Sequence, residues 1–295
     1  MSGLLAGVED ATGHDFRSTE SFIGTSAGSL VAAALVAGQR PRRPSGDARQ
    51  RALPAGPVGE DVADTHASRL PVPRAIAQSI AREALRLAGA AATPLAPMTL
   101  AIGSSASSAL RAALLNRSPG TDTSLSKVHA GVSKTGARFD GRLRVVAVDR
   151  AKGRRVVFGA PGAPDATVAE AVQASCSVPW IFAPVTIGGR EYVDGGVWSN
   201  TNLDVAPAGR ATEVLCLNPI ASLDLAIASP FGVLRALAGS TAALETLALR
   251  NRGARVRMIG PDQDTARIMG PNLMDTRMRD AVLAGGYAQG LTLGR

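Results

Sequence analysis

The 295-residue chain is long enough to bury a substantial core, either as one large α/β domain or as two small ones. Its formal net charge of +8 would suit an anionic partner, either nucleic acid or a lipid surface. An aromatic content of 3% argues against nucleic acid, because single strands are bound by stacking on aromatic side chains. The sequence contains no strongly apolar run of 18 residues and no signal-peptide pattern, so we expect a cytoplasmic protein.

The cysteines and histidines do not form a metal-binding pattern. Cys176 and Cys216 both lie in apolar stretches typical of core positions, and nothing in the sequence supports a disulfide between them. The three histidines, His14, His66 and His129, are far apart in sequence and lack the spacing of metal ligands. We therefore expect neither a metal nor a cofactor.

The first half of the chain predicts helices and one short strand. A helix is expected over Leu4–Thr12, a strand over Ser21–Gly24, and an alanine-rich helix from Leu30 to Ala37. Residues Gln39–Pro73 are rich in Arg, Pro, Gly and Asp and show no apolar period, which predicts a flexible insert within a single domain spanning residues 1–295. Two further helices are predicted over Arg74–Ala91 and Ser104–Leu115.

In the second half, predicted strands alternate with predicted helices. Gly188-Gly189 is a hairpin signal between two of the strands, and either Asp165 or Thr167 would cap the helix before them. The alternation predicts a layered α/β fold with a mainly parallel sheet. The predicted strands are Leu143–Val148, Arg155–Phe158, Trp180–Val185, Glu191–Val193, Val214–Leu217 and Arg255–Ile259, and the predicted helical segments are Thr167–Ser175, Pro230–Arg250 and Asp275–Leu291.

The segment Gly24-Thr25-Ser26-Ala27-Gly28 has the G-x-S-x-G form of a nucleophile elbow. It joins an apolar strand end to a helix, so the turn would lift the Ser26 hydroxyl out of the sheet at the positive end of the helix dipole. We expect Gly24 and Gly28 to be required because a side chain at either position would clash in the tight turn. The alternative is an ordinary strand-to-helix turn in which Ser26 caps the helix.

A catalytic serine needs a base. A Ser-His-Asp triad in the α/β-hydrolase order would need a late histidine, yet the last one is His129, so a triad using His14, His66 or His129 is disfavoured. The other candidate is Asp194, which follows a predicted strand and precedes Gly195 and Gly196. Its carboxylate could accept the serine proton in a partly dry pocket. The alternative is that Asp194 only caps the glycine turn.

Taken together, the two motifs resemble those of the patatin-like phospholipase family. The elbow Gly24–Gly28 is similar to that family's G-T-S-A-G, and Asp194-Gly195-Gly196 to its D-G-[GA] motif, with matching flanks from Ala171 to Pro207. The resemblance implies a three-layer α/β domain and a Ser-Asp dyad without a metal or cofactor. Ser26 would be the nucleophile and Asp194 the general base, acting on lipid acyl esters of the phospholipid or lysophospholipid kind through an acyl-enzyme.

The chain departs from the family pattern at its start. A glycine-rich segment of the form D-G-G-G-x-[RK]-G, whose N–H groups form the family's oxyanion hole, is not found, and the first strand is expected to be missing with it. Either Met1 is an internal residue or a misassigned start, or the chain is a catalytically impaired relative. In the second case it would be a lipid-binding or interaction module that contacts anionic membrane surfaces.

Overall fold

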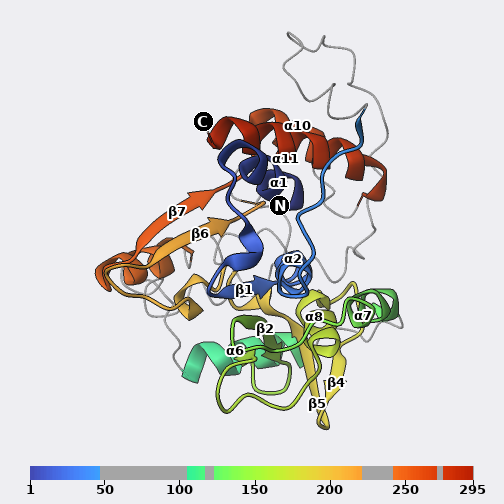
Figure 1. Cartoon of the computed structure of the whole chain (residues 1–295). Helices are drawn as coiled ribbons and strands as arrows, with labels where there is room; N and C mark the ends of the chain where they lie inside the picture. Colours follow the sequence, from blue (N-terminus) through green and yellow to red (C-terminus); the bar gives the residue numbers. More distant parts are fainter. Residues whose placement is uncertain (47–104, 117–122, 221–241, 271–274, 295) are drawn as a thin grey trace.

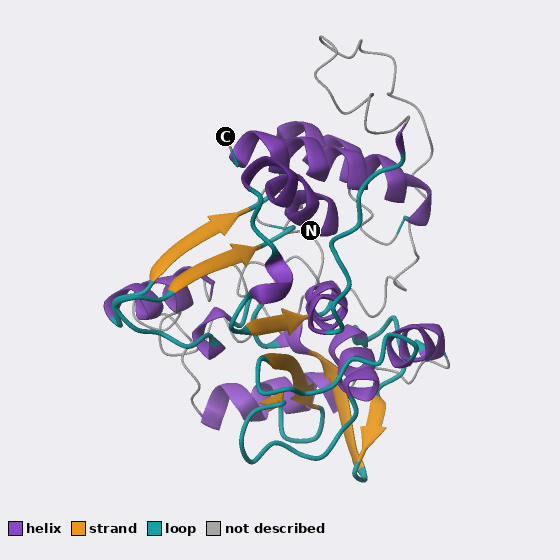
Figure 2. Ribbon diagram, viewed as in Figure 1, coloured by secondary structure: helices purple, strands orange, loops and turns teal. Residues whose placement is uncertain are grey.

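The computed structural model describes residues 1–46, 105–116, 123–220, 242–270 and 275–294. Within them, helices pack around a mixed sheet, so the predicted α/β class is confirmed (Figure 2). The pairings β1–β2 and β6–β7 are parallel, whereas β2–β3, β2–β5 and β4–β5 are antiparallel. The strands are β1 (Phe22–Thr25), β2 (Leu143–Asp149), β3 (Arg154–Phe158), β4 (Val185–Ile187), β5 (Arg190–Asp194), β6 (Glu213–Leu217) and β7 (Arg255–Ile259).

Strand β2 is the axis of the main sheet. Strand β3 pairs along one edge of β2, so β1 and β5 share the other edge. Because β1 runs parallel to β2 and β5 antiparallel, their carboxyl ends approach each other head-on. Thr25 lies opposite Val146, and Asp194 lies opposite the next residue, Ala147. Residues that follow β1 and β5 are thereby brought to one point.

Helices cover both faces of this sheet (Figure 1). Alternate side chains of β2 point to opposite faces. Val145 and Ala147 pack with α2 (Ala27–Val36), α7 (Ser126–Ser133) and α8 (Val168–Cys176), while Val148 packs with Leu115 of α6 (Ser105–Asn116) on the other face. The result is a helix–sheet–helix arrangement around the point where β1 and β5 meet.

A second group of elements lies beside this core. The parallel pair β6–β7 packs with a helix over residues 242–251, and α1 (Ser2–Thr12), α10 (Gln263–Met269) and α11 (Arg279–Leu293) gather together in Figure 1. Helices α1 and α11 approach so closely that a Cβ atom on Gly3 or Gly7 would overlap the α11 backbone. Among the described residues, single-turn 3-10 helices span Phe16–Ser18, Gly195–Val197, Leu203–Val205 and Thr276–Met278.

The predicted elements agree with the structure with one clear exception. The strand predicted over Trp180–Val185 is wrong: residues 180–184 form a turn, a bend and irregular chain, and β4 begins at Val185. Pro179 and Pro184 cannot donate to a strand ladder, and Trp180 has a φ of 68°, which no strand accommodates. The closing helix begins at Arg279 after a 3-10 turn. The predicted helix Arg74–Ala91 and the first part of Pro230–Arg250 lie outside the described residues.

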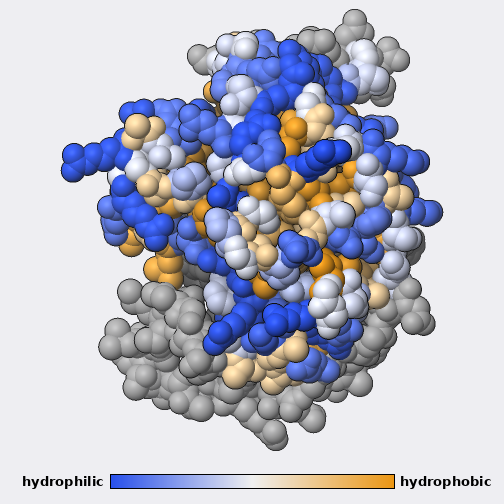
Figure 3. All heavy atoms as spheres, turned by 60° about the horizontal axis from the view of Figure 1, so that its bottom comes forward, coloured by the Kyte–Doolittle hydropathy of each residue, from blue (hydrophilic) through white to orange (hydrophobic). Residues whose placement is uncertain are grey.

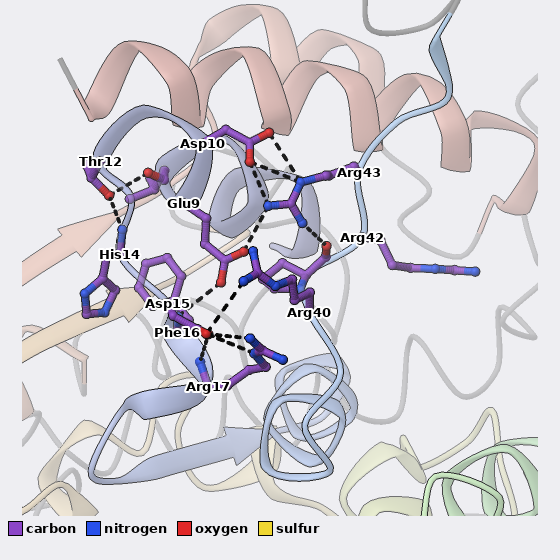
Figure 4. Close-up of polar contacts among 12 residues, drawn as sticks. Glu9, Asp10, Thr12, His14, Asp15, Phe16, Arg17, Arg40, Arg42 and Arg43 are labelled. Carbon is purple, nitrogen blue, oxygen red and sulfur yellow. Dashed lines mark hydrogen bonds and ion pairs between the residues drawn. The ribbon is translucent and has the colours of Figure 1, made fainter.

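The first residues of the predicted insert contact the first helix, whereas its continuation from 47 to 73 lies outside the described residues, so the flexible insert stays a prediction. Figure 4 shows Arg43 reaching back to α1, where its guanidinium contacts Asp10 at 2.7 Å and Glu9 at 3.1 Å. The Glu9 side chain is only 2% exposed and also accepts a hydrogen bond from the Phe16 N–H. This ion pair therefore joins the chain after α2 to the first helix.

Replacing Arg43 by methionine should destabilise the protein by about 1–3 kcal/mol, because it leaves the buried Glu9 carboxylate without its cation. Methionine keeps much of the apolar stem, so the loss reports the charge. The matched control is Arg42→Met at the exposed neighbouring position, where no comparable change is expected. Urea unfolding of both variants measures the difference, and equal midpoints would contradict this role of Arg43.

Candidate active site

Ser26 occupies a strained turn between β1 and α2. Its φ of 51° and ψ of −129° lie in a region that residues other than glycine rarely adopt, at a cost of about 1–3 kcal/mol. The turn is held from outside: the Ser26 N–H donates to Ser175 Oγ at 2.9 Å, and the Ser175 hydroxyl donates to the Val146 carbonyl at 2.7 Å. Ser175 is completely buried in α8. The structure thus places Ser26 on the sharp strand-to-helix turn that the motif predicts.

The Ser26 hydroxyl is not used to cap the helix. No hydrogen bond from the α2 backbone reaches the Ser26 side chain; instead, the Ser29 hydroxyl donates to the Ser26 carbonyl at 2.6 Å. Ala27 and Gly28 are the first two residues of α2, so their N–H groups have no carbonyl within the helix to donate to. The geometry does not support the capping alternative, and it leaves two N–H groups at the helix end beside Ser26.

The four motif glycines are not equivalent. A Cβ atom on Gly24 would overlap the Cα of Ser29, and one on Gly195 would overlap the Val146 carbonyl oxygen. At Gly196 it would lie 2.9 Å from Asp194 Oδ1. At Gly28, by contrast, no described residue lies within 4 Å beyond its own helix turn. The predicted clash at Gly28 is therefore wrong, because its Cβ position is open space among the described residues.

Alanine substitutions at the two elbow glycines should separate these cases. Gly24→Ala is expected to destabilise the fold by about 3 kcal/mol or more, since backbone on both sides has to move. Gly28→Ala should change stability by less than about 1 kcal/mol, because alanine is the better helix former and has space here. Thermal denaturation of the two variants measures this contrast. A larger loss for Gly28→Ala than for Gly24→Ala would show that the packing at the elbow is not as described.

Asp194 is buried at the end of β5 and uses its two carboxylate oxygens differently. Oδ1 accepts the Gly196 N–H at 2.6 Å, which caps the following 3-10 turn. Oδ2 is buried and has no hydrogen-bond partner within 3.5 Å among the described residues. The Ser26 side chain is nonetheless close enough to favour the ionised carboxylate. The capping interpretation is thus satisfied by one oxygen, and the other remains available.

Burial raises the pKa of Asp194 to about 6, although the Ser26 side chain and the Gly196 N–H both act against this rise. The carboxylate is therefore a stronger base than an exposed aspartate and is still ionised at neutral pH. Such a shift, caused by desolvation beside a serine, is characteristic of functional sites.

Other nucleophiles and bases are poorly suited to this site. Cys176 follows Ser175, but burial, with the negative charge of Asp194, raises the pKa of its thiol to about 12. His14 packs edge-on against Phe16, and His129 lies on α7 near Glu170. His66 lies outside the described residues. The described histidines give no support to the triad alternative.

Two buried polar residues at the site carried no role in the sequence interpretation. Ser175 supports the elbow, and Asn202 donates to the Thr25 hydroxyl at 3.0 Å. The feature of the sequence that could have indicated them is a polar residue within an apolar pattern: Ser175 lies on the buried face of α8 among Ala171, Val172 and Ala174. The Ser177 carbonyl also accepts the Asp194 N–H at 2.9 Å, so the end of α8 contacts both motifs.

The chain has a layered α/β fold, a strained serine turn and a buried aspartate beside that turn. These features place it among α/β proteins that present a serine on a strand-to-helix turn. Comparison with known families narrows this class. The family model for patatin-like phospholipases matches residues 4–207, which include both motifs, and the chain belongs to that family.

A curated relative matches a shorter stretch. The probable lipid hydrolase 463L of Invertebrate iridescent virus 6 is 33% identical over 64 residues, which is 22% of this chain and 22% of the viral protein. The match therefore spans about a fifth of either protein.

No helix in the described part of the chain is long and apolar enough to cross a bilayer.

Proposed function

We propose that the protein hydrolyses lipid acyl esters with Ser26 as nucleophile and Asp194 as general base. The observation that carries this proposal is a strained serine close to a buried carboxylate oxygen that has no hydrogen-bond partner among the described residues. Membership of the patatin-like phospholipase family supports a lipid substrate. The name of the viral relative is consistent with the same chemistry.

In the proposed reaction, Ser26 Oγ attacks the ester carbonyl carbon while Asp194 Oδ2 takes the hydroxyl proton. The N–H groups of Ala27 and Gly28 donate to the oxyanion, aided by the positive end of the α2 dipole. The carbon–oxygen bond to the alcohol then breaks, and the proton passes from Asp194 to the departing oxygen. Water attacks the acyl-enzyme with its proton going to Asp194, and the carboxylic acid leaves as Ser26 regains its proton.

One face of the protein is suited to contact with lipid aggregates. Figure 3 shows apolar side chains gathered in the middle of one face, with hydrophilic ones around them. With a net charge of +8, this arrangement suits peripheral contact with an anionic bilayer. The contact should weaken with salt, because screening reduces the attraction between exposed charges.

The test is release of fatty acid from mixed vesicles of phosphatidylcholine and phosphatidylglycerol and from lysophosphatidylcholine, with the Ser26→Ala variant as blank. The proposal predicts release above that blank, which falls on vesicles as salt rises. Vesicle binding with no fatty acid release by either protein would instead favour the alternative function, a lipid-binding module on the same fold. The charge and the apolar face are the observations that favour this second candidate.

A further inference from the structure

We infer that Asn202 is a positioning residue that holds the two motif segments together through Thr25, an inference that rests on the proposed function. Thr25 directly precedes Ser26, and Gly195 directly follows Asp194. The Asn202 amide contacts both: Nδ2 donates to Thr25 Oγ1 at 3.0 Å and lies 3.4 Å from the Gly195 carbonyl. One side chain thus bridges the ends of β1 and β5.

The orientation of this amide is fully specified. Nδ2 also donates to the Ser199 carbonyl at 2.7 Å, while Oδ1 accepts from the Arg155 guanidinium at 3.3 Å. Nδ2 faces the Gly195 and Ser199 carbonyl oxygens, and Oδ1 faces a cation, so an inverted amide would lose all three of these contacts. Asn202 is completely buried and has a φ of 46°, a conformation that asparagine tolerates better than most residues.

Ion pairs and buried hydrogen bonds fix the segment that carries Asn202. Arg155 forms a two-pronged ion pair with Asp204, at 2.6 and 2.7 Å, and lies over the Trp198 ring. Glu245, on the helix over residues 242–251, accepts from the Thr201 hydroxyl at 2.7 Å and from the Leu203 N–H at 2.8 Å. The segment that carries Asn202 is therefore fixed on both sides of the amide.

This geometry matters because β1 and β5 meet end to end and form no backbone hydrogen bonds of a sheet with each other. Both pair with β2, and their separation across the gap depends on what spans it. The Thr25 methyl packs at Gly195, and its hydroxyl receives the Asn202 amide. Loss of the hydroxyl would let the serine and the carboxylate drift apart without removing either of them.

The experiment compares Thr25→Val, which keeps the methyl group and loses the hydroxyl, with Thr25→Ser, which keeps the hydroxyl. The readouts on the full chain are the rate at which a fluorophosphonate modifies Ser26, and kcat and KM for a p-nitrophenyl ester. Thr25→Val should lower the labelling rate and kcat by roughly 10- to 100-fold with little change in KM, as expected when reacting groups are misplaced by up to about 1 Å. Thr25→Ser should stay within a few-fold of the parent protein.

A purely structural role would lower the melting temperature of Thr25→Val and leave the labelling rate of the folded protein unchanged, and that result would overturn the inference while the proposed function stands. Asn202→Leu gives a second check, because it removes the donor at nearly the same side-chain size and should slow labelling at least as much as Thr25→Val. Absence of labelling at Ser26 in the parent protein would instead remove the proposed function, and this inference with it.

Discussion

Replacing Ser26 by alanine is expected to lower kcat for ester hydrolysis by roughly 10⁴-fold or more, the scale seen when a serine nucleophile is removed. The loss should be chemical rather than structural. The side chain makes no capping hydrogen bond, and the Ser26 N–H that donates to Ser175 is retained. Alanine can keep the strained turn, so the melting temperature should change little.

The measurement is fatty acid release together with a thermal melt of the same sample. Ser29→Ala is a matched control, because it removes a nearby hydroxyl that bonds the Ser26 carbonyl rather than the substrate. Its activity loss should be far smaller. Retention of hydrolysis in Ser26→Ala with a normal melt would assign the activity to another residue.

Replacing Asp194 by asparagine should remove most of the activity and at the same time stabilise the protein. Asparagine can still accept the Gly196 N–H, but it cannot take a proton from Ser26. At pH 7.5 the parent protein holds a buried carboxylate whose pKa is raised to about 6 by burial. The neutral amide avoids that desolvation, which should add about 1–3 kcal/mol to the free energy of unfolding.

The pH dependence of this gain follows from the direction of the shift. Asp194 binds its proton more tightly in the folded protein than in the unfolded one. The parent protein therefore loses stability as pH rises from 3.8, the pKa of the unfolded state, through about 6, the pKa of the folded state. The advantage of Asp194→Asn should therefore be full above pH 7 and vanish near pH 4. Urea unfolding of both proteins at these pH values measures it. A variant less stable than the parent at pH 7.5 would show that the carboxylate is not desolvated as described.

Much of the geometry of the candidate site could be predicted because its residues lie in short contiguous motifs. A glycine-flanked serine after an apolar strand predicts an elbow, and an aspartate before two glycines predicts a carboxylate at a strand end. Gly24 confirms the predicted steric clash, since the Ser29 backbone lies where its side chain would be, whereas Gly28 does not. The hairpin at Gly188-Gly189 is likewise confirmed, with φ of 55° and 73°.

What the sequence could not predict depends on contacts between distant segments. Ser175 lies 149 positions from Ser26, and Asn202 lies 177 positions from Thr25. Neither contact leaves a local pattern, only a polar residue where an apolar one would pack. The sequence also did not indicate that β5 runs antiparallel to β2, because the alternation of strands and helices favours a mainly parallel sheet. The prediction of one domain over residues 1–295 stays a prediction.

We propose above that Ser26 is a nucleophile activated by Asp194. The most direct measurement is the rate of covalent modification by a fluorophosphonate between pH 4.5 and 8.5, with the adduct located by peptide mass spectrometry. We predict a single adduct on Ser26, with a rate that rises through a midpoint near pH 6, where Asp194 ionises, and that is largely lost in Asp194→Asn. An adduct on another residue, or a Ser26 rate that Asp194→Asn leaves unchanged, would contradict the claim.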